Sequence, residues 1–93
     1  MSEHDHGYDK DAIGKRLRRI EGQVRGIEKM VDEERYCIDI LTQIGAVQAA
    51  TEKVALGLVD GHVRHCLASA EGDERDAMAS ELMAAVGRLM KTA

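Results

Sequence analysis

Two cysteines and one histidine are the residues of this sequence with the clearest capacity for chemistry. Cys37 and Cys66 are the two cysteines of the 93-residue chain, and His62 precedes Cys66 by about one helical turn. Two thiolates and one imidazole make a soft, three-coordinate ligand set, which selects Cu(I), or Zn(II) when a water or fourth ligand joins. We favour Cu(I), because nothing else in the sequence offers a complete fourth ligand.

The spacing of these residues requires a second copy of the chain if they are to share one ion. Cys37 and His62 are 25 residues apart (62 − 37) on what the apolar pattern predicts to be one helix, a separation of about 37 Å. Two such helices, antiparallel about a two-fold axis near residues 50 and 51, would bring Cys37 of one chain to His62 and Cys66 of the other. Small side chains near that axis would allow a close approach: Gly45, Ala46, Ala49 and Ala50.

Two other interpretations of the same residues stay open. The cysteines can be ordinary buried thiols, with His62 and His65 as surface histidines near a helix end. Alternatively, Cys37 and Cys66 can form a disulfide or a sulfur-bridged link across an interface on oxidation.

Three amphipathic helices per chain are predicted to position these side chains, which makes the fold all-α. Apolar residues recur at the helical period from Asp9 or Asp11, either of which is a plausible N-cap, to about Glu34. A second, unusually long pattern runs from Tyr36 to Cys66.

Glycines mark the points where these helices could bend or end. Gly57 and Gly61 weaken the second helix, so a kink or an early end is possible there. The segment 71–73 is the clearest break, with Asp73 as the candidate N-cap of a third helix. Proline is absent, and no Trp or Phe is present, so the core must be aliphatic.

Length and composition predict a single small domain that associates with its own copies. We expect residues 1–8 to be a flexible polar tail and residues 9–93 to form one helical domain. So short a chain buries too little surface to be very stable alone. No apolar run approaches the roughly 18 residues of a membrane span, and no signal peptide is apparent. A cytoplasmic protein is therefore expected, in which the cysteines are thiols or ligands.

A basic stripe contrasts with the acidic remainder of the chain. The net charge is −4, yet residues 15–29 contain six basic and two acidic side chains. Such a stripe indicates an anionic partner, because Lys and Arg neutralise phosphates in nucleic-acid binding. The alternative is a solvated helix face with intrahelical pairs such as Glu21 to Arg25. The basic residues are Lys15, Arg16, Arg18, Arg19, Arg25 and Lys29.

The sequence resembles the copper-sensitive operon repressor (CsoR) family of bacterial transcription factors. Tyr36-Cys37, the long helix, and Gly61-His62 with Cys66 carry the resemblance, which covers roughly residues 10–90. It implies a dimer-of-dimers homotetramer that holds operator DNA when metal-free, and an intersubunit Cys, His, Cys site whose occupation by Cu(I) releases the DNA. Metal and DNA would then each weaken the binding of the other.

The resemblance also assigns roles to residues outside the ligand set. Tyr36 and Glu81 match the residues that link the bound metal to DNA affinity, and Arg16 and Lys53 match basic positions used for DNA. Lys at position 53 lacks the two-pronged recognition that Arg offers. We extend the DNA-binding set to Lys15, Arg18 and Arg19 from charge alone.

The family contains sensors of other inducers, and the ligand set discriminates among them. Nickel and cobalt sensors resemble this chain but place His where Cys66 stands, and persulfide sensors lack the histidine that stands here at His62. The alternatives to a Cu(I)-responsive repressor are a thiol-based sulfur-sensing repressor and a copper-buffering protein without DNA binding. His4 or His6 could supply a second metal site in the tail.

An enzyme is not expected from these residues. No paired carboxylates or activated nucleophile can be assembled from the sequence, and a metal site closed by protein ligands leaves no position for a substrate.

Overall fold

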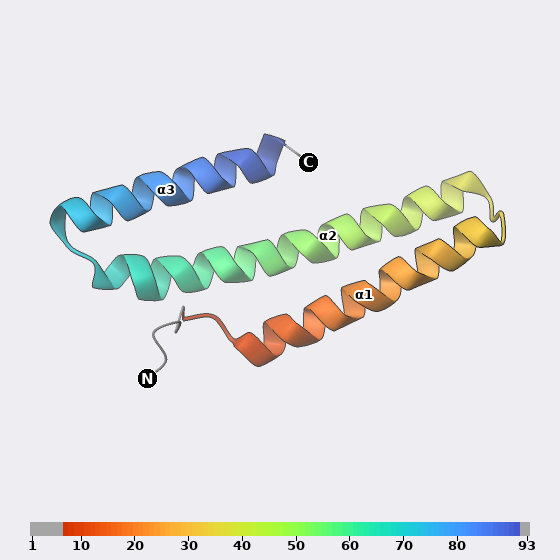
Figure 1. Cartoon of the computed structure of the whole chain (residues 1–93), viewed down its shortest axis with the longest axis horizontal. Coiled ribbons are helices and arrows are strands. Elements are labelled where there is room, and N and C mark those ends of the chain that lie inside the picture. Colours follow the sequence, from red (N-terminus) through yellow and green to blue (C-terminus); the bar gives the residue numbers. More distant parts are fainter. Residues whose placement is uncertain (1–6, 92–93) are drawn as a thin grey trace. The chain divides into compact units, whose positions relative to one another are not determined.

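The chain is mostly helical in the part that the structure describes, residues 7–91. In this computed structural model, three α-helices and one π-helical turn follow one another (Figure 1): α1 is Lys10–Asp32, α2 is Cys37–Gly61, the π-helix η1 is His62–Leu67, and α3 is Gly72–Lys91. No β-strand occurs within residues 7–91. The predicted all-α class with three helices is confirmed.

The start of α1 resolves the choice between the two predicted N-caps. Asp9 has an extended backbone, and its side chain accepts a hydrogen bond from the backbone N–H of Ala12 at 3.0 Å. Asp11 instead lies in the first turn, where its charge faces the positive end of the helix dipole. Asp9 therefore satisfies one of the backbone donors that every helix leaves unpaired at this end.

The end of α1 is a Schellman turn built without glycine. The backbone N–H of Arg35 donates to the carbonyl of Met30 at 2.9 Å, and the N–H of Glu34 donates to that of Val31 at 3.0 Å. This pairing requires a left-handed residue after the cap, and Glu34 takes that role with a φ of 55°. A residue with a Cβ is strained in this conformation, so the turn that leads into α2 carries a backbone strain energy of about 1 kcal/mol.

The second predicted helix changes its hydrogen bonding before it reaches Cys66. The α-helix ends at Gly61, and residues His62–Leu67 form a π-helical turn instead of continuing α2. The chain is helical through Cys66, as predicted, and the α-helical part ends at Gly61, the second of the two glycines at which a kink or an early end was expected to be possible. Gly57 remains inside α2, where a Cβ would lie 3.2 Å from Ile13 Cδ1 of α1.

The third helix begins slightly earlier than its predicted cap. Gly72 opens α3 with a φ of 57°, and Asp73 lies in the first turn. The prediction of Asp73 as N-cap is wrong, because the left-handed Gly72 makes the turn one residue earlier.

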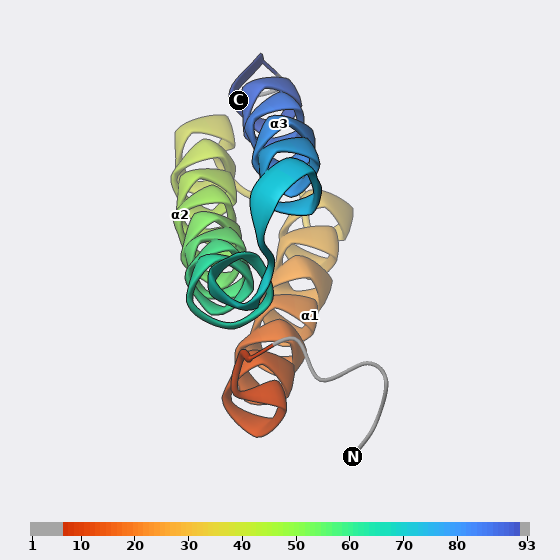
Figure 2. The same cartoon turned by 90° about the vertical axis from the view of Figure 1, so that its left-hand side faces the viewer.

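Two compact units divide the described chain, Tyr8–Val59 and a second unit that joins Gly7 to Asp60 and the residues after it. In the first unit, α1 runs back alongside α2, as Figures 1 and 2 both show. The second contains η1 and α3, which contact each other. The predicted tail at residues 1–8 falls mostly outside the described residues, as do His4 and His6.

Little apolar surface is buried within one chain. Val54 in the first unit and Ala70 in the second are the buried hydrophobic residues of the described part. Large apolar side chains remain exposed on all three helices, among them Leu17, Val24 and Val31 of α1, Ile38, Leu41 and Leu56 of α2, and Met83 and Met90 of α3. None of the helices within residues 7–91 is long and apolar enough to cross a membrane.

Candidate functional site

His62 and Cys66 lie together on the π-helical turn η1. Both side chains are half-buried, and the turn closes with the backbone N–H of Ala68 donating to the carbonyl of Val63, five residues earlier. A π-turn holds one residue more than an α-turn, and single π-turns inside helices are frequently found at functional sites. The structure thus places two of the three predicted ligands on one short, irregular segment.

Side chains that bond to backbone carbonyls brace this turn. The Ser69 hydroxyl donates to the carbonyl of His65 at 2.6 Å, and the Arg75 guanidinium of α3 donates to the carbonyl of Ala68 at 3.2 Å. Gly7 also lies against the turn with a φ of 76°, and a Cβ there would overlap the His65 side chain and the Gly61 carbonyl oxygen. Two side-chain hydrogen bonds and the close approach of Gly7 therefore reach the segment that carries His62 and Cys66.

Sequence reasoning missed Arg75 as part of this bracing. A basic side chain in the first turn of a helix is unfavourable for the helix dipole, and Arg75 stands in that turn beside the acidic Asp73 and Glu74. The unfavourable position of this positive charge in the sequence could have indicated that Arg75 has a partner outside its own helix.

Cys37 occupies a very different setting at the first turn of α2. It is exposed, and it follows Tyr36, whose carbonyl accepts the N–H groups of Asp39 at 3.0 Å and Ile40 at 3.2 Å. The Tyr36 side chain is 69% exposed. Cys37 therefore lies at the surface, at the N-terminal end of α2.

Within one chain, the three predicted ligands belong to two units. Cys37 lies in Tyr8–Val59, and His62 and Cys66 lie in the unit that starts at Asp60. Within residues 7–91 of the single chain, no group of three His, Cys, Asp or Glu side chains lies close enough together to hold a metal. Both cysteines are free thiols. The three-residue metal site therefore stays a prediction.

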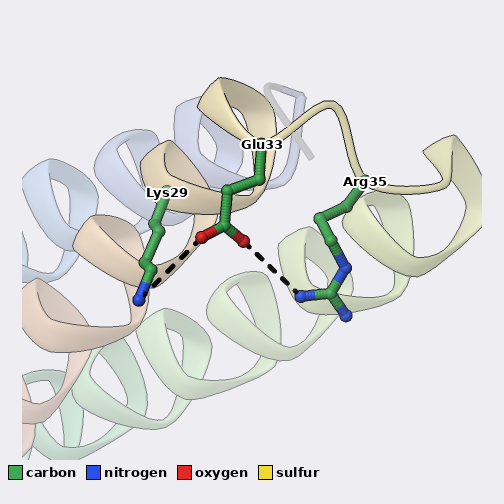
Figure 3. Close-up of polar contacts among 3 residues, drawn as sticks. All are labelled: Lys29, Glu33 and Arg35. Atoms are coloured by element: carbon green, nitrogen blue, oxygen red, sulfur yellow. Dashed lines mark ion pairs between the residues drawn. The ribbon is translucent and has the colours of Figure 1, made fainter.

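Charged pairs flank both segments. Next to His62, the Arg64 Nε donates to Asp60 Oδ1 at 2.7 Å, and this hydrogen bond raises the pKa of Arg64. Before Cys37, the Glu33 carboxylate lies 4.0 Å from Lys29 Nζ and 3.9 Å from an Arg35 nitrogen (Figure 3). All of these side chains are well exposed, so each pair contributes little to stability.

The other predicted site residues lie on the helix surfaces. Glu81 of α3 and Lys53 of α2 are exposed, and so are the α1 residues Lys15, Arg16, Arg18 and Arg19. The pair between Glu21 and Arg25, which a purely solvated face would favour, is not among the ion pairs of the described residues. The basic side chains of α1 between residues 15 and 25 thus present their charge to solvent.

Comparison with known proteins gives a consistent result over nearly the whole chain. Residues 9–88 match the family described as metal-sensitive transcriptional repressor. The copper-sensing transcriptional repressor RicR of Mycobacterium tuberculosis is 52% identical over 92 residues, which cover 94% of this chain and 96% of RicR. The copper-sensing transcriptional repressor CsoR of Bacillus subtilis is 55% identical over 82 residues, covering 86% of this chain and 80% of that relative.

A solved structure gives the same result for the fold. The crystal structure of the copper-sensing repressor CsoR with Cu(I) from Geobacillus thermodenitrificans superposes with a TM-score of 0.80 at 44% sequence identity. The match covers 91% of this chain and 97% of that one.

Proposed function

Because this chain belongs to the family of metal-sensitive transcriptional repressors, we propose that it is a Cu(I)-responsive repressor. Without copper it binds operator DNA as an oligomer in the cytoplasm, and Cu(I) binding releases the DNA and derepresses copper-resistance genes. The family consists of transcriptional repressors, and a role without catalysis follows from it. The observation that carries the copper assignment is the pair of free thiols with a histidine on the π-turn, in a chain 52% and 55% identical to copper-sensing repressors.

The donors present in the chain fit a soft cation. Cys37 is exposed at a helix N-terminus, and His62 and Cys66 share one braced turn. Sulfur and imidazole donors in a set of three suit Cu(I). The thiols must lose their protons on binding, so acidification weakens the site.

The site is assigned to two protomers rather than one. In a single chain, α2 extends for about 37 Å between Cys37 and the turn that carries His62. An antiparallel dimer places Cys37 of one protomer beside the π-turn of the other, twice over, and pairing of two such dimers gives the homotetramer. The exposed apolar side chains of all three helices supply surface for these contacts.

The DNA-binding residues are assigned to α1 and α2. Arg16 and Lys53 are exposed and match, by the family resemblance, basic positions used for DNA, and Lys15, Arg18 and Arg19 add exposed positive charge on α1. Tyr36, next to Cys37, and Glu81 of α3 are assigned to the coupling between metal and DNA. Such coupling is reciprocal and typically changes affinity by about 5 to 150-fold.

Anaerobic titration of the reduced protein with Cu(I), while its binding to its own promoter DNA is followed, tests this function. DNA release complete at one Cu(I) per chain, lost in Cys37→Ala with operator binding intact, is the expected result. Tight copper binding with unchanged DNA affinity would instead indicate a copper buffer. Release by persulfide but not by Cu(I) would indicate a sulfur sensor.

Mixing two defective variants tests the intersubunit assignment separately. Cys37→Ala and Cys66→Ala chains each lack a complete site alone. After subunit exchange, about half of the dimers contain one chain of each kind and thus one intact site, which amounts to about one Cu(I) per four chains. Mixtures that bind no more copper than either variant alone would show that the three ligands do not come from two chains.

A further inference from the structure

The basic residues of α1 lie on two different sides of the helix. At about 100° per residue, Arg18 and Arg16 point about 160° apart. Lys15, Arg18, Arg25 and Lys29 instead fall within about 80° of one another, on the side roughly opposite the apolar stripe. We call these four residues the outer basic face; it extends for about 21 Å along α1, from Lys15 to Lys29.

The outer basic face has little charge of opposite sign. All four side chains are exposed, and Lys29 is the one that takes part in an ion pair among the described residues, with Glu33 at 4.0 Å. The acidic residues of the central part of α1, Glu21 and Glu28, lie outside this arc by the same helical geometry. A row of solvated cations, of which only Lys29 among the described residues has an ion-pair partner, is the charge complement of a row of phosphates.

A glycine lies in the middle of this face without an evident role in the chain itself. Gly22 is exposed, and a Cβ on it would meet only an Arg25 nitrogen at 3.9 Å, an ordinary contact. A glycine in the middle of a helix is destabilising relative to alanine. The fold of one chain would therefore be more stable with alanine at position 22, while the missing side chain leaves the α1 backbone open to a close approach from outside.

We propose that the outer basic face lies along one sugar–phosphate backbone of the operator, with Gly22 as the point of closest approach. This inference rests on the proposed repressor function and adds Gly22, Arg25 and Lys29 to the DNA-binding residues. Lys15 and Arg18 bind on this face, and Arg16 contacts the DNA from the other side of α1. Contacts of this kind fix the position of the protein on the duplex but do not read its bases.

The charge of the face is tested with Arg25→Ala. Each phosphate contact contributes about 0.9 to the slope of log K against log salt, so losing Arg25 should lower that slope by about 0.9 for every protomer that touches DNA. The loss should be the same for operator and unrelated duplexes. Arg88→Ala, which removes an exposed basic residue of α3, is the matched control and should leave the slope unchanged.

The close approach is tested with Gly22→Ala and Gly22→Leu. Gly22→Ala should raise the melting temperature by a few degrees and yet weaken operator binding. Gly22→Leu should weaken operator binding further. The Cu(I) affinity of both variants should stay at the wild-type value. Gly87→Ala is the control, since Gly87 is an exposed glycine inside α3 whose added Cβ meets nothing within 4 Å. It should raise the melting temperature without changing DNA binding.

The outcomes separate this inference from the function on which it rests. If the wild-type protein does not bind its promoter DNA, the repressor function itself fails. If Arg16→Ala weakens binding while Arg25→Ala and Gly22→Leu bind as tightly as wild type with an unchanged salt slope, the repressor function stands and the outer basic face is overturned.

Discussion

The two segments assigned to the metal differ in how the chain holds them. Cys37 stands exposed at the first turn of α2, after a turn in which Glu34 is strained at a φ of 55°. His62 and Cys66 are half-buried on a π-turn that Ser69 and Arg75 brace through hydrogen bonds to its carbonyls. One half of the proposed site is thus organised by its own chain, and the other is a single thiol at a helix end.

This difference assigns distinct tasks to the two halves. The braced turn fixes the positions of two donors before any ion arrives, which lowers the ordering cost of binding. In the proposed intersubunit site, the exposed thiol completes the ligand set only when a second chain presents it. Under this proposal, metal binding depends on the relative position of two protomers, and that position would control the DNA-binding surfaces.

The largest effect on DNA release is expected from substitutions that remove the coupling between metal binding and DNA binding, one near the π-turn and one next to Cys37. Glu81→Ala, on the α3 helix that contacts η1, should leave Cu(I) affinity nearly unchanged and abolish DNA release, a loss of about 5 to 150-fold in coupling. Tyr36→Phe makes the same test beside Cys37 by removing one hydroxyl. Parallel titrations with Cu(I) and promoter DNA measure both.

Comparing Glu81→Ala with Tyr36→Phe also tests whether both halves of the proposed site take part in the coupling. Loss of coupling in both shows that the two halves transmit the signal together. Normal release in Glu81→Ala would show that this residue has been given the wrong role, whatever Tyr36→Phe does.

A moderate effect is expected from loosening the braced half. Arg75→Ala removes the hydrogen bond to the Ala68 carbonyl, so the free energy of unfolding should fall by about 1 kcal/mol and Cu(I) affinity by about 10-fold. Chemical denaturation and competition with a Cu(I) chelator measure the two quantities. Arg35→Ala, whose ion pair with Glu33 precedes Cys37, is the control and should change neither; equal effects of the two substitutions would argue against preorganisation by α3.

The smallest effect is expected at the strained turn before Cys37. Glu34→Gly relieves the left-handed strain and should raise the free energy of unfolding by about 1 kcal/mol with unchanged Cu(I) affinity. Glu34→Ala keeps the strain and removes the charge. If thermal unfolding shows the same gain for alanine as for glycine, the charge near the helix end and not the backbone conformation is the cause.

The helices could be predicted from the sequence because their signals are local. The apolar period predicted α1 to within about two residues at its end, Asp9 was one of the two predicted caps, and Gly61 was one of the two glycines at which α2 was expected to bend or end. The π-turn could not be predicted, since the same residue types fit α- and π-helical turns and only the hydrogen-bond register differs. Asp73 was misjudged because Gly72, its neighbour, makes the turn through its backbone alone.

The candidate site also has a part that could be predicted from the sequence and a part that could not. Residue type and spacing single out Cys37, His62 and Cys66, because few side chains bind soft metals. The bracing by Ser69 and Arg75 depends on carbonyls that a π-turn and a helix end leave available, and no local pattern reports these. The outer basic face could have been found from the sequence by applying helical geometry to the basic stripe.

Few apolar side chains are buried within one chain, and this affects how the stability of the protein depends on its concentration. In the proposed oligomer, a chain whose buried hydrophobic residues, among those described, are Val54 and Ala70 would gain most of its folding free energy from contact with other copies. Its melting temperature is then expected to rise with its concentration, because association stabilises by mass action. The proposed repressor would therefore couple its own folding to its concentration, since dilution favours unfolded chains that cannot bind the operator.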